Sequence, residues 1–223
     1  MMRFLALLLA ALPIGHSVDG RAIRPAVLGS PAAAHRVLVV GCIHGNETAG
    51  IAIVQQLMRR HAPAGTEIVA VTSVNPDGCE RGIRQNAHGV DLNRNFPSNW
   101  ARIGRRGSFQ WSGPHPLSEP ESRYVVKLVD QLKPQITIWF HQHQGFVRAW
   151  GQSVATARRF AQLADYPYQS IRWPFGTVSN WQNHRFPGTA SFVVELPAGP
   201  VPPSRIAVWV RAIREIAREG VGP

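Results

Sequence analysis

The chain has 223 residues, of which 44% are hydrophobic and 17% are charged. This length and composition predict one substantial hydrophobic core, and they exclude an intrinsically disordered chain. Two cysteines are too few for a disulfide framework or a four-cysteine zinc module. The formal net charge is +11, and 24 residues are Lys or Arg, of which only two are Lys. The arginines form no dense tract and no recognised nucleic-acid motif, so we expect no nucleic-acid partner. Attraction to an acidic cell surface stays open.

The N-terminal run Met1–Leu12 has one arginine followed by apolar residues. A positive start, an apolar centre and small residues near its end are typical of a secretory signal. We therefore predict a signal peptide over residues 1–13 and a catalytic domain over residues 14–223. From this signal peptide we expect the protein to be exported to the periplasm or cell envelope. We also expect the mature protein to have no transmembrane segment. If the run is instead a buried helix or follows a misplaced start codon, a cytoplasmic protein is expected.

Strands and helices alternate along the rest of the chain, which predicts an α/β domain with a mixed, largely parallel sheet. In chain order, we expect an edge strand over Ala22–Leu28, strands over Val37–Ile43, Glu67–Val74, Ile136–Phe140 and Ser191–Leu196, and helices over Thr48–Arg60, Glu119–Leu132, Ala155–Ala164 and Ser204–Glu219. The Gly-, Pro-, Asn- and Arg-rich segment Asn75–Ser118 is expected to be a long loop, and loops of that length are usually functional.

Candidate metal ligands follow two of the predicted strands, where ligands gather in α/β sheets. His44 and Glu47 come after the first buried strand, and imidazole and carboxylate are ordinary zinc ligands. Taken alone, the pair is weak, because a glutamate at a helix start also favours the helix dipole. His141 and His143 end a later strand on the same face, so strand periodicity does not choose between them. The alternative is that neither histidine binds a metal and that both lie in a solvated loop.

Further polar residues complete a candidate catalytic site. Glu195 lies within the apolar run SFVVEL, where a glutamate is either at an exposed edge or retained as a general base. The long loop contains the segments NPDG, RQN and GVDLNRNFP. Its arginine and asparagine side chains suit a substrate carboxylate or an oxyanion.

Together, HGNE, NPDG, RQN, GVDLNRNFP, the strand end FHQH and SFVVELP resemble the zinc carboxypeptidase family in order and wording. The chain looks most like the family's bacterial murein peptide amidase branch, whose members cut the γ-D-glutamyl–diaminopimelate bond of cell-wall peptides. The resemblance implies a single-domain α/β/α sandwich and one Zn²⁺ per chain. It also implies a zinc-dependent hydrolase of a C-terminal peptide or amide bond, which we expect to be a monomer acting on cell-wall peptides.

The resemblance also implies residue roles. His44, Glu47 and His141 would bind zinc, with His141 preferred because it directly follows an apolar strand. Glu195 would be the general base that activates a zinc-bound water, and Arg84 would steady the oxyanion. Asn93 and Arg94 would hold the substrate's terminal carboxylate, with His143 as a further pocket residue.

The family's usual lid tyrosine shortly before the catalytic glutamate is missing here. The nearest upstream tyrosine is Tyr168, and the intervening stretch offers Trp173, Trp181 and His184. The residue that closes over the substrate is therefore open. Whether Cys42 and Cys79 pair is open as well.

Two other functions remain as alternatives. An N-acyl amino acid amidohydrolase of the aspartoacylase and succinylglutamate desuccinylase type shares the HGNE and DLNR patterns. A non-catalytic, peptide-binding relative is the third hypothesis, although the presence of every ligand and of Glu195 argues against it.

Overall fold

The computed structural model describes residues 12–222, so most of the predicted signal peptide lies outside the described residues. A seven-stranded mixed sheet forms the centre of the molecule, in the order β3-β5-β4-β6-β9-β7-β8. Its strands are β3 (Ala26–Gly29), β4 (His35–Val40), β5 (Thr66–Val71), β6 (Ile136–Gln142), β7 (Phe146–Ala149), β8 (Tyr168–Ser170) and β9 (Ala190–Leu196). The four central strands β5, β4, β6 and β9 are parallel, whereas β3 and β7 pair antiparallel to their inner neighbours.

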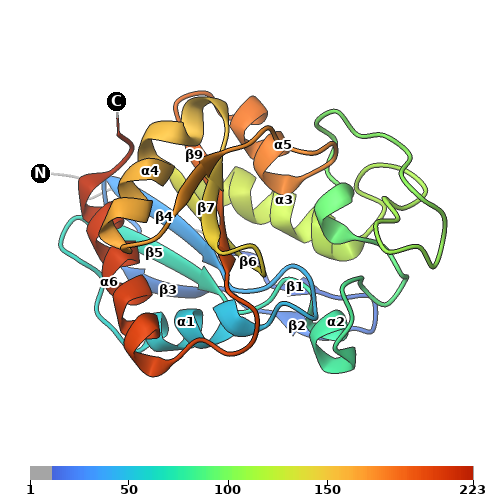
Figure 1. Cartoon of the computed structure of the whole chain (residues 1–223), viewed down its shortest axis with the longest axis horizontal. Helices are drawn as coiled ribbons and strands as arrows, with labels where there is room; N and C mark the ends of the chain where they lie inside the picture. The colour runs from blue at the N-terminus through green and yellow to red at the C-terminus, as the bar shows by residue number, and fades with distance from the viewer. Residues whose placement is uncertain (1–11, 223) are drawn as a thin grey trace, which may run out of the picture.

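Helices cover both faces of this sheet (Figure 1). On one face, α1 (Ala49–Met58), α4 (Val154–Leu163) and α6 (Pro203–Glu219) pack together over a core that includes Phe160 and Trp209. On the other face, α3 (Pro120–Leu132) and α5 (Val178–Arg185) cover a core centred on Trp139. The predicted α/β/α sandwich is confirmed. None of the helices within residues 12–222 is long and apolar enough to cross a membrane.

Several predicted elements differ from the structure at their ends. The strand predicted over Val37–Ile43 stops at Val40. Beyond Val40 the backbone still pairs with the end of β5, because the Gly41 N–H donates to the Val71 carbonyl. A side chain at Gly41 would lie 2.6 Å from the carbonyl oxygen of Thr72, so this close approach requires glycine. The predicted strand Ala22–Leu28 is two strands, β2 (Ala22–Ile23) and β3, because Pro25 between them has no N–H to donate. The short β2 pairs with β1 (Gly15–His16) instead of joining the main sheet.

The predicted long loop is partly helical. It begins with the short helix α2 (Pro76–Arg81), which Asn75 caps by accepting a hydrogen bond from the Gly78 N–H. A single 3₁₀ turn, η1 (Leu92–Arg94), follows later in the same segment. Another 3₁₀ turn, η2 (Gly151–Ser153), precedes α4. The elements β1, β7, β8 and α5, all of which are short, were not predicted.

Candidate active site

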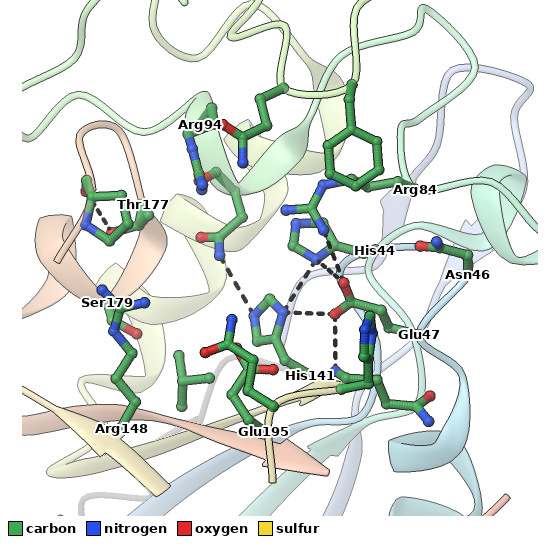
Figure 2. A pocket seen from close by; sticks show the side chains of 18 of the residues that line it. His44, Asn46, Glu47, Arg84, Arg94, His141, Arg148, Thr177, Ser179 and Glu195 are labelled. Carbon is green, nitrogen blue, oxygen red and sulfur yellow. Dashed lines mark hydrogen bonds and ion pairs between the residues drawn. The ribbon is translucent and has the colours of Figure 1, made fainter. Parts of the chain in front are cut away.

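The ends of two neighbouring parallel strands bring the three predicted metal ligands together. His44 follows β4, Glu47 lies just before α1, and His141 lies near the end of β6. All three side chains are buried and face one another (Figure 2). Among the described residues, they form the one group of three whose ligand atoms lie within 4.8 Å of one another.

The ligand atoms of this group converge closely. Oε1 of Glu47 lies 2.9 Å from Nδ1 of His44, and Oε2 of Glu47 lies 2.8 Å from Nδ1 of His141. The two Nδ1 atoms are 3.1 Å apart. Two ligand atoms bound to one tetrahedral zinc are separated by about 3.3 Å, given bonds of about 2.0–2.1 Å. The donor set and its spacing therefore fit a zinc ion.

Asp91 supports this centre, although it was not among the residues predicted to form the site. It is fully buried, and its Oδ1 lies 3.0 Å from Nε2 of His44. A carboxylate only accepts hydrogen bonds, so Nε2 of His44 carries the proton and Nδ1 presents its lone pair to the centre. Asp91 also accepts hydrogen bonds from the Asn93 N–H and from Nε of Arg84. Its place at the start of a turn, in GVDLNRNFP, was the signal that could have identified it.

The buried charges of the centre shift one another's pKa values: those of the two carboxylates fall and that of His44 rises. Burial raises the pKa of Glu47, but the nearby His44 and His141 outweigh burial and hold this pKa well below its usual range. Burial likewise opposes the charged form of Asp91, and His44 and Arg84 reverse that effect to lower the pKa of Asp91. Burial lowers the pKa of His44, whereas Asp91 and Glu47 raise it overall. Both carboxylates are thus ionised, as metal binding requires.

Glu195 lies on β9 directly beside His141, its register partner on β6. The Glu195 side chain is buried, and its Oε2 atom has no hydrogen-bond partner. The hydroxyl of Tyr166 donates to the backbone carbonyl of Glu195, which fixes the strand at this position. A carboxylate oxygen without a partner, next to a metal site, is suited to accept a proton from a bound molecule.

Arg84 reaches the same centre from the loop. Its Nε donates to Asp91, and its Nη1 lies 2.9 Å from Oε1 of Glu47. The guanidinium also packs over the ring of Phe109, with 4.8 Å between its Cζ and the ring centroid. Arg84 is thereby held at the edge of the metal centre.

Asn93 and Arg94 lie on the turn η1 and are both mostly buried. The Asn93 Oδ1 accepts from the Val178 N–H, which turns its amide nitrogen toward Nε2 of His141, 3.5 Å away. Arg94 donates to the Asn93 carbonyl, and it has no carboxylate within 4.0 Å among residues 12–222. Burial lowers the pKa of Arg94, and the negative charge of Asp91 only partly opposes that shift.

The three metal-ligand candidates, Arg84, Asn93, Arg94 and Glu195 line one pocket of about 420 Å³, and Asp91 lies behind it. His143 lies at its exposed rim, outside the metal group, so the structure brings His141 and not His143 to the centre. Of the aromatic candidates for the missing lid residue, Trp173 lines the pocket, whereas Trp181 is buried against Phe96. The pocket is also lined by Arg148, which was not predicted as a site residue.

The fold and the site together are those of a metallohydrolase with a two-histidine, one-glutamate centre. Residues 8–173 match the zinc carboxypeptidase family, and the chain belongs to this family. The predicted resemblance is confirmed, and zinc, the predicted cofactor, is the metal of the family. Glu195 lies beyond the matched residues, so its assignment depends on its geometry.

Among curated proteins, the chain is similar to murein peptide amidase A of Escherichia coli K12, with 34% identity over 146 residues. The match covers 59% of this chain and 60% of that protein. It is also 31% identical to gamma-D-glutamyl-L-diamino acid endopeptidase 1 of Lysinibacillus sphaericus, over 54% of this chain and 33% of the relative. The chain thus spans about 60% or less of the length of these relatives.

Solved structures agree with the observed fold. The murein-tripeptide amidase of Escherichia coli O157 superposes with a TM-score of 0.73 and 25% identity, covering 92% of this chain and 89% of that one. Carboxypeptidase A from Helicoverpa armigera superposes with a TM-score of 0.77 at 18% identity, covering 93% of this chain and 68% of that one. The carboxypeptidase-like fold is confirmed.

Proposed function

We propose that the chain is a zinc-dependent peptidase that hydrolyses the amide bond between γ-D-glutamate and diaminopimelate in cell-wall peptides. The observation that carries this proposal is the position of Glu195. Its partner-free Oε2 lies in the same buried pocket as the group formed by His44, Glu47 and His141. Relatives named for murein peptides and for γ-D-glutamyl diamino acid bonds support the substrate class.

Substrate binding follows from the two residues of the turn η1. Arg94 has no carboxylate partner among the described residues, and it lines the pocket together with Asn93. A terminal carboxylate of the substrate would balance the charge of Arg94 through charge-assisted hydrogen bonds. This contact would place the terminal residue of the substrate inside the pocket and its amide bond near the metal centre.

Proton transfer is the task of Glu195. When bound by His44, Glu47 and His141, zinc supplies a Lewis acid that polarises a carbonyl and lowers the pKa of water. Glu195 accepts a proton from the attacking water and delivers it to the amine nitrogen as the amide bond breaks. The products are the free carboxylate and the free amine. Arg84, at the edge of the centre, stabilises the negative charge that develops on the carbonyl oxygen.

The test is hydrolysis of L-Ala-γ-D-Glu-diaminopimelate by the purified protein, followed by mass spectrometry. We expect release of diaminopimelate, which chelation should abolish and Glu195→Gln should slow by about 10²–10⁴-fold. Glu67→Gln is the matched control, because Glu67 is also a buried glutamate of the sheet but lies on β5, outside the pocket. It should keep wild-type activity.

A survey of other substrates decides between the proposal and its alternative. Cleavage of ordinary C-terminal peptides, with the tripeptide left intact, would overturn the murein assignment. Cleavage of N-acyl amino acids alone would point to the amidohydrolase type. No turnover of any substrate by zinc-loaded protein would overturn the enzymatic proposal.

We also propose that the protein is exported and acts in the cell envelope. The apolar run after Arg3 supports this, and a cell-wall substrate would be found there. Expression with the native N-terminus, followed by fractionation and N-terminal mass analysis, tests it. We expect a processed chain that begins near residue 14. An unprocessed chain in the cytoplasm would contradict export.

A further inference from the structure

Arg148 enters the pocket from the strand next to the one that carries Glu195. It lies on β7, which pairs antiparallel with β9 so that Arg148 faces Val193 and Phe146 faces Glu195. Residues paired in this way point to the same face of a sheet, so Arg148 shares the face of Glu195. Figure 2 shows the Arg148 side chain rising from the sheet into the pocket, on the same side as Glu195.

The charge of Arg148 is only partly compensated by the protein. One guanidinium nitrogen donates to the backbone carbonyl of Arg172, and the group lies over the Trp173 ring with 5.7 Å from Cζ to the centroid. Its Nε atom is buried without a hydrogen-bond partner. Within residues 12–222, Arg148 has no carboxylate at ion-pair distance.

An arginine in this state is costly to keep unless something binds to it. Burial lowers the pKa of Arg148, the charge of Glu195 opposes that shift, and the positive charge of Arg94 adds to it. A buried polar group without a partner destabilises the fold. If Arg148 served only to fill space, an apolar side chain on β7 would avoid this cost. The partly buried, unpaired guanidinium is instead suited to an anionic ligand.

The pocket contains two such arginines. Arg94 and Arg148 both line it, and among the described residues neither has a carboxylate at ion-pair distance. The positive charge of Arg94 also contributes to the lowered pKa of Arg148. Under the proposed function, the terminal carboxylate of the substrate binds Arg94. That leaves Arg148 available for a second negative group on the same residue.

We propose that Arg148 binds a second carboxylate, carried by the side chain of the substrate's C-terminal residue, and that it selects dicarboxylic leaving groups. This inference rests on the proposed function and identifies a specificity-determining residue for it. Diaminopimelate has such a second carboxylate at the far end of its side chain. Lysine has the same chain and amine without that carboxylate, so the two amino acids differ at the group that Arg148 would bind.

The experiment compares L-Ala-γ-D-Glu-diaminopimelate with L-Ala-γ-D-Glu-Lys, using the zinc-loaded full chain. Wild-type protein should have a higher kcat/KM for the diaminopimelate peptide by about 10- to 100-fold, the worth of a charge-assisted contact. Arg148→Leu should lose most of that factor on the diaminopimelate peptide and should change the lysine peptide little. Arg148→Lys retains a point charge without the planar guanidinium. Its preference for the diaminopimelate peptide should lie between those of the wild type and Arg148→Leu.

The matched control is Arg158→Leu. Arg158 also packs over an aromatic ring, that of Tyr168, but it is exposed on α4 and outside the pocket. It should keep the wild-type preference. Zinc content and thermal unfolding, measured for every variant, establish that each is folded and loaded.

Two results would overturn the inference. A wild-type protein that cleaves both peptides equally well has no such selectivity. If Arg148→Leu instead lowers kcat/KM for both peptides by the same factor and shifts the acid limb of the pH profile, then Arg148 acts on Glu195 and not on the substrate's side chain.

A binding measurement separates failure of this inference from failure of the proposed function. Calorimetric titration of the zinc-loaded protein with free diaminopimelate and with free lysine needs no turnover. If neither peptide is cleaved but diaminopimelate binds more tightly than lysine, and Arg148→Leu removes the difference, the specificity site stands without the proposed reaction. Equal binding, or no binding of either, would refute it.

Discussion

Replacing Asp91 by asparagine tests whether the metal centre depends on the residue behind it. Asp91 is fully buried and makes three contacts, to Nε2 of His44, to the Asn93 N–H and to Nε of Arg84. Asparagine keeps an oxygen for His44 and Asn93, but its amide nitrogen would face the donor Nε of Arg84. It also removes the negative charge that favours the ligand tautomer of His44.

The magnitude follows from these contacts. Loss of an outer carboxylate partner of a metal-bound histidine costs about 10–100-fold in metal affinity, or about 1.4–2.8 kcal/mol. In the variant, the amide nitrogen of the new asparagine and Nε of Arg84 are both donors, so a charge-assisted hydrogen bond is replaced by repulsion. We expect this to reduce the free energy of unfolding by about 1.5–3 kcal/mol. We therefore expect weaker zinc binding and a lower unfolding temperature in the same variant.

The assay is competition for zinc against a chromogenic chelator, with urea unfolding of the metal-free protein as the second readout. Asp130→Asn, on the exposed surface of α3, is the matched control and should change neither quantity. If Asp91→Asn binds zinc as tightly as the wild type, then Asp91 does not orient His44, and this reading of the centre is wrong.

Three further predictions concern the rest of the molecule. The sulfurs of Cys42 and Cys79 are 3.0 Å apart, and a hydrogen bond from Cys42 lowers the pKa of Cys79 to about 7. Oxidised glutathione should therefore join them at a rate that rises through about pH 7 and should stabilise the fold by up to about 4 kcal/mol; two thiols still titratable after oxidation would contradict this. Burial raises the pKa of Asp77, but hydrogen bonds from its neighbours outweigh burial and lower it, so its contribution to stability should be present above about pH 4 and lost as the pH falls toward the lower folded-state pKa. Urea unfolding from about pH 6 to about pH 3 should show a flatter acid dependence for Asp77→Asn, and an unchanged slope would argue against this. Trp209→Ala should reduce the free energy of unfolding by about 3–5 kcal/mol, because Trp209 is 1% exposed on the core-facing side of α6. A loss well below that range in urea unfolding would mean that the core closes over the cavity.

The sequence predicted the parts of the site that depend on local pattern. Apolar runs marked the buried strands, and polar residues at their ends indicated His44, Glu47 and Glu195. The choice between His141 and His143 could not come from alternation, because both fall on the same face. The structure separates them, because β6 ends at Gln142, so that His141 stays within the sheet and His143 lies exposed at the rim.

The remaining site residues depend on tertiary arrangement. Arg148 enters the pocket only because β7 folds back antiparallel to β9, and a four-residue strand interrupted by an arginine has no clear periodic signal. Asp91 lies in a segment without regular periodicity, so its contact with His44 across 47 residues was not visible in the chain. The end of β4 was not visible in the chain either, since the apolar run continues to Ile43 whereas the strand ends at Val40.

The metal content of single variants, measured by native mass spectrometry on protein purified without added chelator, tests the zinc centre most directly. We expect one zinc ion per wild-type chain, loss of zinc in His44→Ala and His141→Ala, and retention of zinc in His143→Ala. Glu195→Gln should retain zinc as well, while losing activity. A wild-type chain without zinc, or loss of the metal from His143→Ala with retention in His141→Ala, would contradict the assignment of the centre.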